Sequence, residues 1–178
     1  ALEPGEADNP FGTRSSAGKL FGASGGVMEA AIRTAYYMLT GKDLESPKIE
    51  FTRGLDGIKE GKVKIGDLEV GFAVVSGVGN APKILDQIKK GRKDIHFIEV
   101  MTCPGGCIAG GGQPLDNDQG KIKARMASLY SIDSGSSLRF SHRNPYINDL
   151  YKNFLGKPLG EKSHELLHTH YSKRKVCS

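Results

Sequence analysis

The sequence predicts an α/β protein in which a partly parallel β-sheet is flanked by helices. Apolar residues recur at helical spacing over residues 27–40 and again over residues 80–90. Residues 58–76 alternate instead, around a Gly-Asp turn, which indicates a β-hairpin. A further β-type run at residues 95–100 follows the second helix. The order strand, helix, strand is typical of a βαβ crossover between parallel strands.

The chain opens with an irregular segment, residues 1–19, which has no apolar periodicity and contains glycines and prolines. The glycine-rich residues 20–26 lead into the helix at residues 27–40, for which Ser24 is a plausible N-cap and Gly41 a plausible C-cap. Glycines before a helix leave its first N–H groups accessible to an anion. Close packing against a neighbouring segment explains the same pattern, so it does not by itself predict a phosphate site.

The β-type pattern begins at residue 49. Residues 49–53 form one candidate strand, and the hairpin pairs residues 58–65 with residues 68–76. Asn80 can cap the next helix and Gly91 can end it. The β-branched and aromatic run at residues 95–100 is typical of a buried strand.

The last third of the chain is helical in pattern. Residues 118–132 form a polar helix, residues 133–137 resemble a linker, and residues 144–171 hold short helices, the first with Pro145 at its first position. This tail is too small to fold alone, so we expect it to wrap a larger body. The domain division expected is therefore 1–133 for the main lobe and 134–178 for the tail.

Composition excludes several classes of protein. The chain has 178 residues and a net charge of +5, but its basic residues are scattered among acidic ones and cluster only near the C-terminal end. This favours a solvated surface over a nucleic-acid groove. No apolar stretch is long enough to cross a bilayer, and no signal peptide is visible. Three cysteines, two of them close together, favour a reducing compartment. We expect a cytoplasmic protein, or a periplasmic one exported with a partner.

The loop at residues 101–114 carries the strongest chemical signal. Cys103 and Cys107 lie four positions apart among five glycines, directly after the predicted strand. Glycine permits the tight backbone approach that a side chain would block. Thiolates are the usual ligands of iron–sulfur clusters, so metal ligation is the preferred interpretation. A tight turn with two inert cysteines, or a disulfide, remains an alternative.

The other candidates are weaker. Residues 164–168, His-Glu-Leu-Leu-His, literally match a zinc-peptidase motif, but the motif is short, and packing or surface histidines explain it better. Glu29 is either a proton-pathway acid or an acidic residue favoured by the helix dipole. Cys177 lies in a basic tail without matching surroundings.

Three segments together resemble one known family. Residues 99–107, Glu-Val-Met-Thr-Cys-Pro-Gly-Gly-Cys, with Gly-Gly-Gly-Gln-Pro at 110–114, resemble the last signature motif of [FeFe]-hydrogenases. Residues 21–31 resemble the helix-opening motif that precedes it. Residues 141–168 resemble the family's small-subunit segment, which many members fuse to the large subunit.

The resemblance implies a cofactor and a reaction. The fold would be one lobe of the family's H-domain, with a wrapping helical tail. The cofactor would be an H-cluster, a [4Fe–4S] cube joined to a two-iron unit with CO and cyanide ligands, and the reaction would be the reversible reduction of protons to H2. Cys103 matches a ligand of the cube, and Cys107 matches the catalytic cysteine that bridges cube and two-iron unit. Met101 and Phe21 match apolar residues that pack near the two-iron unit and would exclude water from it.

The sequence also departs from the family. Two earlier motifs, of Thr-Ser-Cys-Cys-Pro and Met-Pro-Cys-x-x-Lys type, are missing. They supply the other cube ligands, a proton-relay cysteine and a lysine that holds a cyanide. A cube needs four ligands, and this chain offers two in the right context. We therefore expect a partner chain that carries the missing N-terminal half, with the site at the interface.

The function expected is that of a split hydrogenase subunit, served by an electron-carrier protein or subunit, ferredoxin- or NAD(P)-linked. The alternative is a non-catalytic relative that assembles iron–sulfur clusters or senses H2. The partner's sequence separates the two, because a relay cysteine and a cyanide-holding lysine favour turnover.

Overall fold

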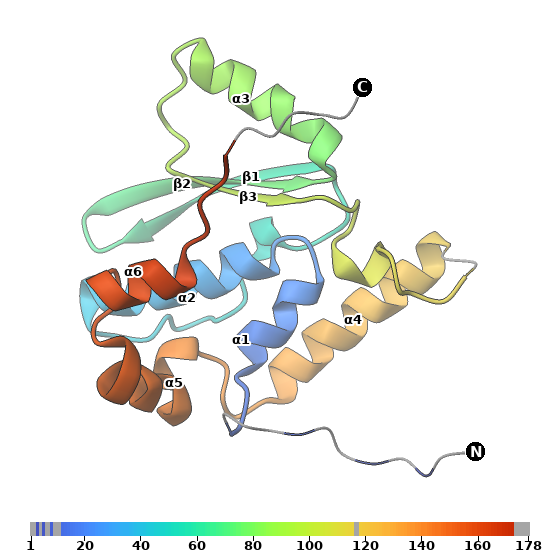
Figure 1. Ribbon diagram of the computed structural model, residues 1–178. Coiled ribbons are helices and arrows are strands. Elements are labelled where there is room, and N and C mark those ends of the chain that lie inside the picture. The colour runs from blue at the N-terminus through green and yellow to red at the C-terminus, as the bar shows by residue number, and fades with distance from the viewer. Residues whose placement is uncertain (1–2, 4, 6–7, 9–11, 116–117, 173–178) are drawn as a thin grey trace.

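A three-layer arrangement organises the part of the chain that can be described. The computed structural model describes residues 12–115 and 118–172, together with residues 3, 5 and 8. Within this part a three-stranded sheet lies between helix α3, Ala81–Lys89, on one face and helix α2, Gly26–Thr40, on the other (Figure 1). No helix in the described ranges has the length and apolar character needed to cross a membrane.

The sheet confirms the predicted hairpin and crossover. Strands β1, Ile58–Ile65, and β2, Leu68–Ser76, pair antiparallel with Ile65 opposite Leu68, so the turn falls at Gly66-Asp67 as predicted. Strand β3, Phe97–Met101, pairs parallel with β2, and α3 provides the crossover. The strand order is β1-β2-β3. The predicted α/β class with a partly parallel sheet is therefore confirmed.

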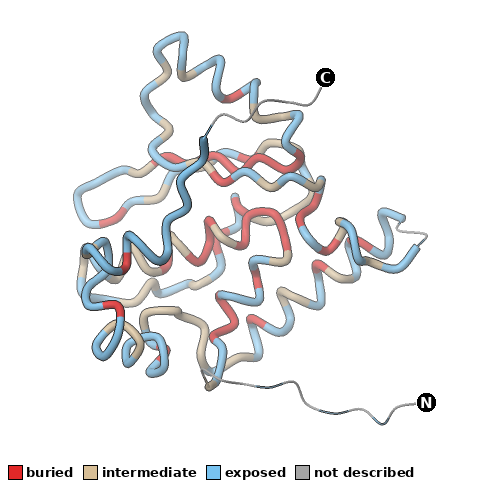
Figure 2. The backbone as a smooth tube through the Cα atoms, in the orientation of Figure 1, coloured by how far each residue is buried: buried red, intermediate tan, exposed pale blue. Residues whose placement is uncertain are grey.

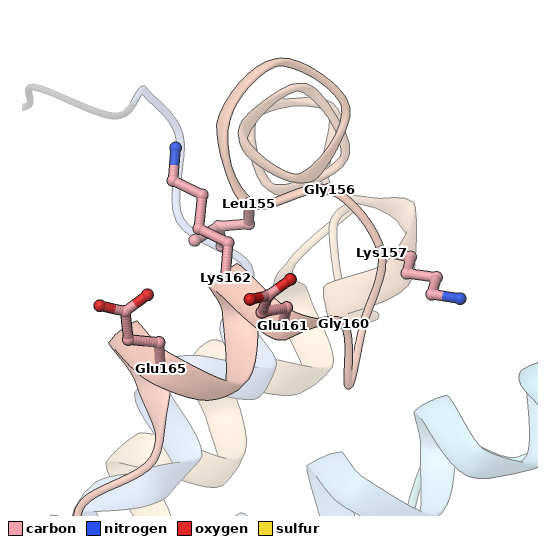
Figure 3. A pocket seen from close by; sticks show the side chains of 7 residues that line it. All are labelled: Leu155, Gly156, Lys157, Gly160, Glu161, Lys162 and Glu165. Atoms are coloured by element: carbon pink, nitrogen blue, oxygen red, sulfur yellow. The ribbon is translucent and has the colours of Figure 1, made fainter.

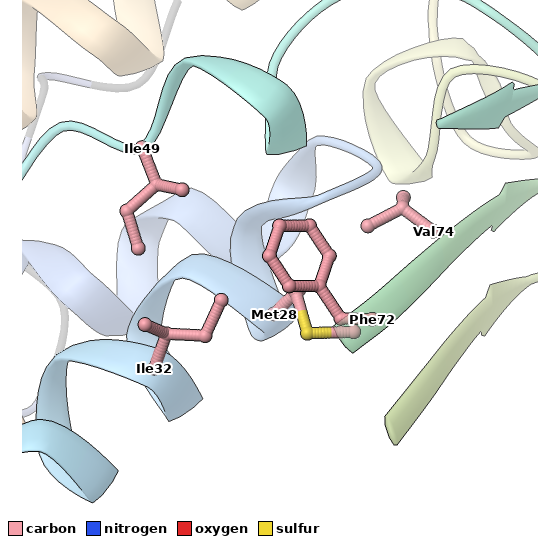
Figure 4. Close-up of a cluster of buried hydrophobic side chains, with 5 residues drawn as sticks. All are labelled: Met28, Ile32, Ile49, Phe72 and Val74. Carbon is pink, nitrogen blue, oxygen red and sulfur yellow. The ribbon is translucent and has the colours of Figure 1, made fainter. Parts of the chain in front are cut away.

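The core forms where α2 packs on the sheet. Met28 and Ile32 from α2 meet Phe72 and Val74 from β2, and Ile49 closes the cluster (Figure 4). Residues of β2 with the opposite parity, Ala73 and Val75, pack against Ile84 of α3. Alternation along β2 thus buries both of its faces, and Figure 2 shows buried residues concentrated along the sheet and the start of α2.

The prediction of a strand at residues 49–53 is wrong. Residues Glu50–Thr52 form a single 3-10 turn, η2, instead. The Thr52 hydroxyl donates to the Ile49 carbonyl at 2.8 Å and lies 3.0 Å from the Glu29 carboxylate on α2. These local and tertiary bonds compete with strand pairing, as Thr hydroxyls commonly do. The segment is held to α2 rather than paired with β1.

Strand β3 also differs from its prediction. It begins at Phe97 rather than at residue 95, and within the described ranges it is an edge strand rather than a buried one. Phe97 is 44 % exposed and Val100 is 47 % exposed. An apolar run cannot by itself show how many neighbours its strand has, because pairing partners are distant in sequence.

The helix ends are partly as predicted. Gly41, with φ of 72°, caps the C-terminus of α2 as predicted, but the N-cap is Gly25, with φ of 97°, rather than Ser24. Asn80 is the N-cap residue of α3, although its side chain donates to the Ser76 carbonyl instead of capping. Helix α3 ends at Lys89, with Lys90 as its C-cap residue, and Gly91, with φ of 100°, ends the helix in the left-handed conformation as predicted.

The remaining elements surround this body. Helix α1, Ser16–Lys19, and the 3-10 turn η1, Leu20–Gly22, precede α2. Helix α4, Gln119–Gly135, packs beside α1 and extends past the predicted start of the linker at residue 133. The tail consists of η5, Ser141–Arg143; α5, Pro145–Leu150; the π-helical turn η6, Tyr151–Leu155; and α6, Glu161–Leu167.

The tail is fixed to α2 by its first turn. The His142 ring stacks on Tyr37 of α2 with centroids 4.2 Å apart, and its Nε2 lies 2.8 Å from the Asp43 carboxylate. Asn144 donates to the Thr13 carbonyl at 2.9 Å. Pro145 begins α5 as predicted. The tail thus packs against the larger body, as expected of a segment too small to fold alone.

Candidate metal centre

The cysteine loop leaves the carboxyl end of β3. Strand β3 ends at Met101, and the 3-10 turn η4, Cys107–Ala109, follows within the loop. Cys103 is half-buried, Cys107 is exposed, and both are free thiols. The disulfide alternative is therefore not the arrangement found. In open α/β sheets, ligands bind outside the carboxyl ends of the strands, and both thiols lie at such an end.

Two glycines allow the loop to lie directly on the turn before α2. Gly105 and Gly106 have φ angles of 88° and 95°, which other residues rarely adopt. A Cβ on Gly106 would lie 2.7 Å from the Ser24 nitrogen and 2.8 Å from the Gly22 oxygen. The Ser24 N–H donates to the Gly105 carbonyl at 3.0 Å. The glycine-rich segment at residues 20–26 and the glycine-rich cysteine loop are thus in direct contact.

Strand β2 fixes the same loop from the other side. The buried hydroxyl of Ser76, the last residue of β2, accepts a hydrogen bond from the Gly105 N–H at 2.6 Å. The Gly77 N–H donates to the Met101 carbonyl at 2.8 Å. The cysteines therefore extend from a backbone held by two strands and one helix start, which is the rigid support that a metal site needs.

Glycine is also required beside the Cys103 thiol. A Cβ on Gly110 would lie 2.9 Å from the Cys103 sulfur, so only glycine leaves room next to that thiol. Gly111 has no neighbouring atom within 4 Å of where its Cβ would be. The described residues contain no group of three or more His, Cys, Asp or Glu side chains placed to hold a metal ion. The two free thiols are thus half of the four ligands that an iron–sulfur cube takes.

Glu99 holds the turn at the start of α2. Its carboxylate accepts from the Gly25 N–H at 2.5 Å and from the Met28 N–H at 2.7 Å. These are the N-terminal N–H groups of α2, so the protein's own carboxylate fills the anion site that the glycines suggest. Glu99 lies two residues before Met101 on β3. One side chain therefore connects the strand that leads to the cysteines with the turn on which they rest.

Lys59 completes this support from β1. Its ammonium donates to the Ser24 carbonyl at 3.0 Å and to the Gly54 carbonyl at 2.9 Å. Burial lowers the pKa of Lys59 to about 8, and the negative charges of Glu99 and Asp56 only partly oppose this. A buried lysine bonded to these two carbonyls holds the turn before α2 against the segment at Gly54.

A network of buried charges lies behind the site. Glu29 is 1 % exposed and accepts from Arg33 and from Arg53, each at 2.7 Å. Arg33 also donates to Asp133 of α4 at 2.8 Å, and Arg139 donates to the same carboxylate at 2.6 Å. The sequence left a proton-pathway role open for Glu29. In the structure its carboxylate is bonded to two guanidinium groups. The bond from Arg139 to Asp133 crosses the domain boundary predicted between residues 133 and 134. That boundary stays a prediction.

The charges around Asp133 decide its titration. Burial alone would raise the pKa of this carboxyl, but hydrogen bonds from Arg33, Arg139 and Ser16 hold it well below its usual range. Asp133 is fully buried, so these partners replace its hydration.

The apolar candidates lie around the loop. Met101, at the end of β3, is half-buried, and Phe21, in η1, is 45 % exposed. Turn η1 contacts η4, which begins at Cys107, so Phe21 belongs to an element beside the cysteine loop. Val78, two residues after Ser76, is 56 % exposed. This end of the sheet therefore presents apolar side chains and a thiol to its surroundings.

Sequence reasoning missed the supporting residues Ser76, Glu99 and Lys59. Of these three, only Glu99 could have been noticed in the sequence, because it is an acidic residue within an apolar strand. Charged groups are buried only when they are paired, so its position indicated a buried partner without identifying it.

The zinc motif does not form a centre in the described residues. His164 is in α6 and its ring lies 4.2 Å from that of His168, but no third ligand completes a metal site in the part of the chain described. Glu165 lines a cavity of about 350 Å³ in the tail, with Leu155, Lys157 and Lys162 (Figure 3). Cys177 lies outside the described residues.

Comparison with known proteins identifies two matching segments. Residues 1–111 match the family described as iron only hydrogenase large subunit, C-terminal domain. Residues 119–174 match the iron hydrogenase small subunit family.

Individual relatives agree with this. The NADP-reducing hydrogenase subunit HndD of Solidesulfovibrio fructosivorans is 52 % identical over 168 residues, covering 94 % of this chain and 28 % of the relative. A solved [FeFe]-hydrogenase of Chlamydomonas reinhardtii superimposes with a TM-score of 0.72 at 42 % identity, covering 96 % of this chain and 50 % of that one. A more distant relative, the cytosolic iron-sulfur assembly component 3 of Mus musculus, is 30 % identical over 84 % of this chain and 31 % of its own length. The chain thus spans half or less of the length of these relatives.

Proposed function

The chain belongs to the iron-only hydrogenase family, and from this premise we propose that it is one part of a split [FeFe]-hydrogenase. In this proposal, a partner chain carries the missing N-terminal half of the H-cluster domain. The two chains together catalyse the reversible combination of two protons and two electrons into H2. Cys103 and Cys107 ligate an H-cluster that lies between them, and Cys107 is the catalytic residue.

The observation that carries the proposal is the fixed pair of thiols. Cys103 and Cys107 extend from a loop bonded to Ser76 and Ser24, at the carboxyl end of β3. An iron–sulfur cube takes four ligands, and the described residues present two. The proposal assigns the remaining ligands to the partner chain.

The roles of this chain's residues follow from their positions. When bound, the H-cluster would supply the redox chemistry. Cys103 and Cys107 would hold it, and Gly110 avoids a clash with the Cys103 sulfur. Met101 and Phe21 would exclude water from its two-iron unit, and Glu99 keeps the loop and the turn before α2 in register.

The proposal also includes an electron donor or acceptor. An electron-carrier protein or subunit, ferredoxin- or NAD(P)-linked, exchanges electrons with the cluster. The similarity to a subunit named as NADP-reducing supports the nicotinamide-linked arrangement. We place the assembly in the cytoplasm, where reduced thiols persist, although export with a partner would also suit a hydrogenase.

The test is the complex of this chain with its natural partner, purified without oxygen after cluster maturation. Cys103→Ser and Cys107→Ser should each lower the iron content and abolish H2 production from a reduced viologen dye. Cys177→Ser is the matched control and should change neither measurement. Full iron content and full turnover in both site variants would refute the assignment of the ligands.

The more distant relative supports a second candidate, a non-catalytic iron–sulfur protein. Such a protein would assemble clusters or sense H2. A complex that retains iron through Cys103 and Cys107 but neither produces nor consumes H2 would favour it. A partner that lacks the relay cysteine and the cyanide-holding lysine would point the same way.

A further inference from the structure

The Gly-Gly-Gly-Gln-Pro segment at residues 110–114 folds back on the cysteine loop. The Gln113 N–H donates to the Gly110 carbonyl at 3.3 Å, which closes a tight turn between these two residues. Gly112, the third residue of the turn, has a φ of 89°, the left-handed value that type II turns require at that position. The turn returns the Gln113 side chain toward the cysteines.

The Gln113 amide reaches the backbone of Cys107. Its Nε2 donates to the Cys107 carbonyl at 3.1 Å. The same carbonyl accepts from the Gly110 N–H at 3.1 Å, so both of its lone pairs are used. Gly110 also lies against the Cys103 sulfur, which a Cβ at this position would approach to 2.9 Å. The turn thus touches both cysteines, one through a glycine and the other through a side-chain donor.

The next residue of η4 is held from a different direction. Ile108 is buried and clusters with Ile122 of α4. Its carbonyl accepts from the Arg125 guanidinium, also on α4, at 2.9 Å. Helix α4 therefore fixes Ile108. Cys107 itself is exposed, so packing does not fix it, and the position of its carbonyl depends on the turn that ends at Gln113.

We propose that Gln113 is a positioning residue for the iron–sulfur cluster and acts through the carbonyl of Cys107. The inference rests on the proposed function, in which Cys107 is a ligand. The donor hydrogens are the positive end of the amide dipole, and this end lies against the backbone of the ligand. Donors and dipoles around a metal ligand set both its orientation and the reduction potential of the metal. Gln113 thus fixes the Cys107 peptide and stabilises the reduced state of a cluster bound there.

Two variants remove the donor, and a third is the control. Gln113→Leu has a side chain of similar size without N–H groups, and Gln113→Glu keeps the shape but carries a carboxylate. Gln119→Leu is the matched control, because Gln119 is the exposed first residue of α4. Circular dichroism and urea denaturation of the free chain check that all three variants fold like the wild type.

The free chain gives the first measurement and needs no iron. The carbonyl ¹³C resonance of Cys107 should move to higher field in Gln113→Leu, because this carbonyl loses a hydrogen bond. The Ile108 carbonyl is the internal control, since its donor Arg125 is unchanged. Gln119→Leu should leave both resonances in place. An unmoved Cys107 resonance in Gln113→Leu would refute the contact and, with it, the proposal.

The reduction potential of the cluster gives the second measurement. The complex with the natural partner is purified without oxygen and titrated with redox mediators while electron paramagnetic resonance follows the reduced cluster. Gln113→Leu should make one-electron reduction about threefold less favourable, a shift of about 30 mV to more negative potential at about 59 mV per tenfold change. Gln113→Glu should shift the potential further in the same direction, because its carboxylate adds negative charge. Gln119→Leu should not shift it.

Iron content separates this role from ligation. Both Gln113 variants should hold as much iron as the wild-type complex, whereas Cys107→Ser should hold less. A complex that loses its iron with Gln113→Leu, or a potential that stays unchanged in both Gln113 variants, would overturn the assignment, since a contact that only closes the loop would not move the potential.

The outcomes also separate this inference from the proposed function. If the wild-type complex holds iron through Cys103 and Cys107 while Gln113→Leu leaves the potential unchanged, the role of Gln113 is wrong and the function stands. If the Cys107 resonance moves as expected but the wild-type complex holds no iron at these cysteines, the contact is right, and the proposed function fails together with the role of Gln113 at the cluster.

Discussion

Glu99→Gln is the most informative single substitution in the support of the cysteine loop. The Glu99 carboxylate accepts from two backbone N–H groups at the start of α2, at 2.5 and 2.7 Å. Glutamine has the same length but one carbonyl oxygen, so its amide group must face one of these two donors. The substitution also removes the negative charge that is bonded to this helix start, where such a charge is favourable.

The magnitude follows from these contacts. A hydrogen bond to a charged group contributes about 1.5–3 kcal/mol, and a buried N–H that loses its partner costs about 1–3 kcal/mol. Glutamine keeps one acceptor, so we expect Glu99→Gln to lower the free energy of unfolding by about 3 kcal/mol. Glu99→Ala removes both acceptors and should cost more.

Urea denaturation of the purified chain at neutral pH measures this change. Glu69→Gln is the control, because Glu69 pairs with Lys62 on the surface and is 65 % exposed. Solvent screening makes such pairs weak, so we expect no measurable change there. If Glu99→Gln and Glu69→Gln unfold at the same urea concentration, Glu99 does not hold the turn before α2, and the account of how the cysteine loop is positioned is wrong.

Three further predictions concern the same body. Gly106→Ala should lower the free energy of unfolding by about 2–4 kcal/mol in urea denaturation, because the new Cβ would clash with the backbone of residues 22–24. The control is Gly112→Ala, which has a similar φ but no atom within 4 Å of the new Cβ and should cost at most about 1 kcal/mol. Asp133→Asn should lower stability at pH 7 by about 3–5 kcal/mol. The folded-state pKa of Asp133 is lowered, so its contribution is fully present above about pH 4 and decreases as the pH falls toward the folded-state value. The advantage of the wild-type chain over Asp133→Asn should therefore be smaller at about pH 2 than at about pH 7, and an equal advantage at the two pH values would contradict this. The pKa of Lys59 is lowered to about 8, so between about pH 8 and 10.5 the unfolded chain binds more protons than the folded chain. The free energy of unfolding of the wild-type chain should therefore rise over this interval relative to that of Lys59→Met. Parallel pH profiles of the two proteins would contradict the lowered pKa of Lys59.

Local pattern was sufficient for the elements whose periodicity is strong. The hairpin turn at Gly66-Asp67, the parallel crossover through α3, the C-cap Gly41 and the first position of α5 at Pro145 are all as the sequence predicts. Each depends on residues that are close along the chain, where backbone sterics and side-chain spacing act directly. Residues 49–53 failed for the opposite reason, since their bonds to Glu29 on α2 override the local preference for a strand.

The family and the two thiols Cys103 and Cys107 could be inferred without coordinates, because motif residues are contiguous and their chemistry is intrinsic. Only the tertiary structure decided how these thiols are supported, through Ser76, Glu99 and Lys59 from three different strands. It alone showed that, among the residues described, β3 lies at an edge of the sheet with Phe97 and Val100 exposed. Contacts between residues far apart in sequence do not produce a periodic sequence pattern, because burial and strand pairing depend on the folded arrangement and not on any one segment.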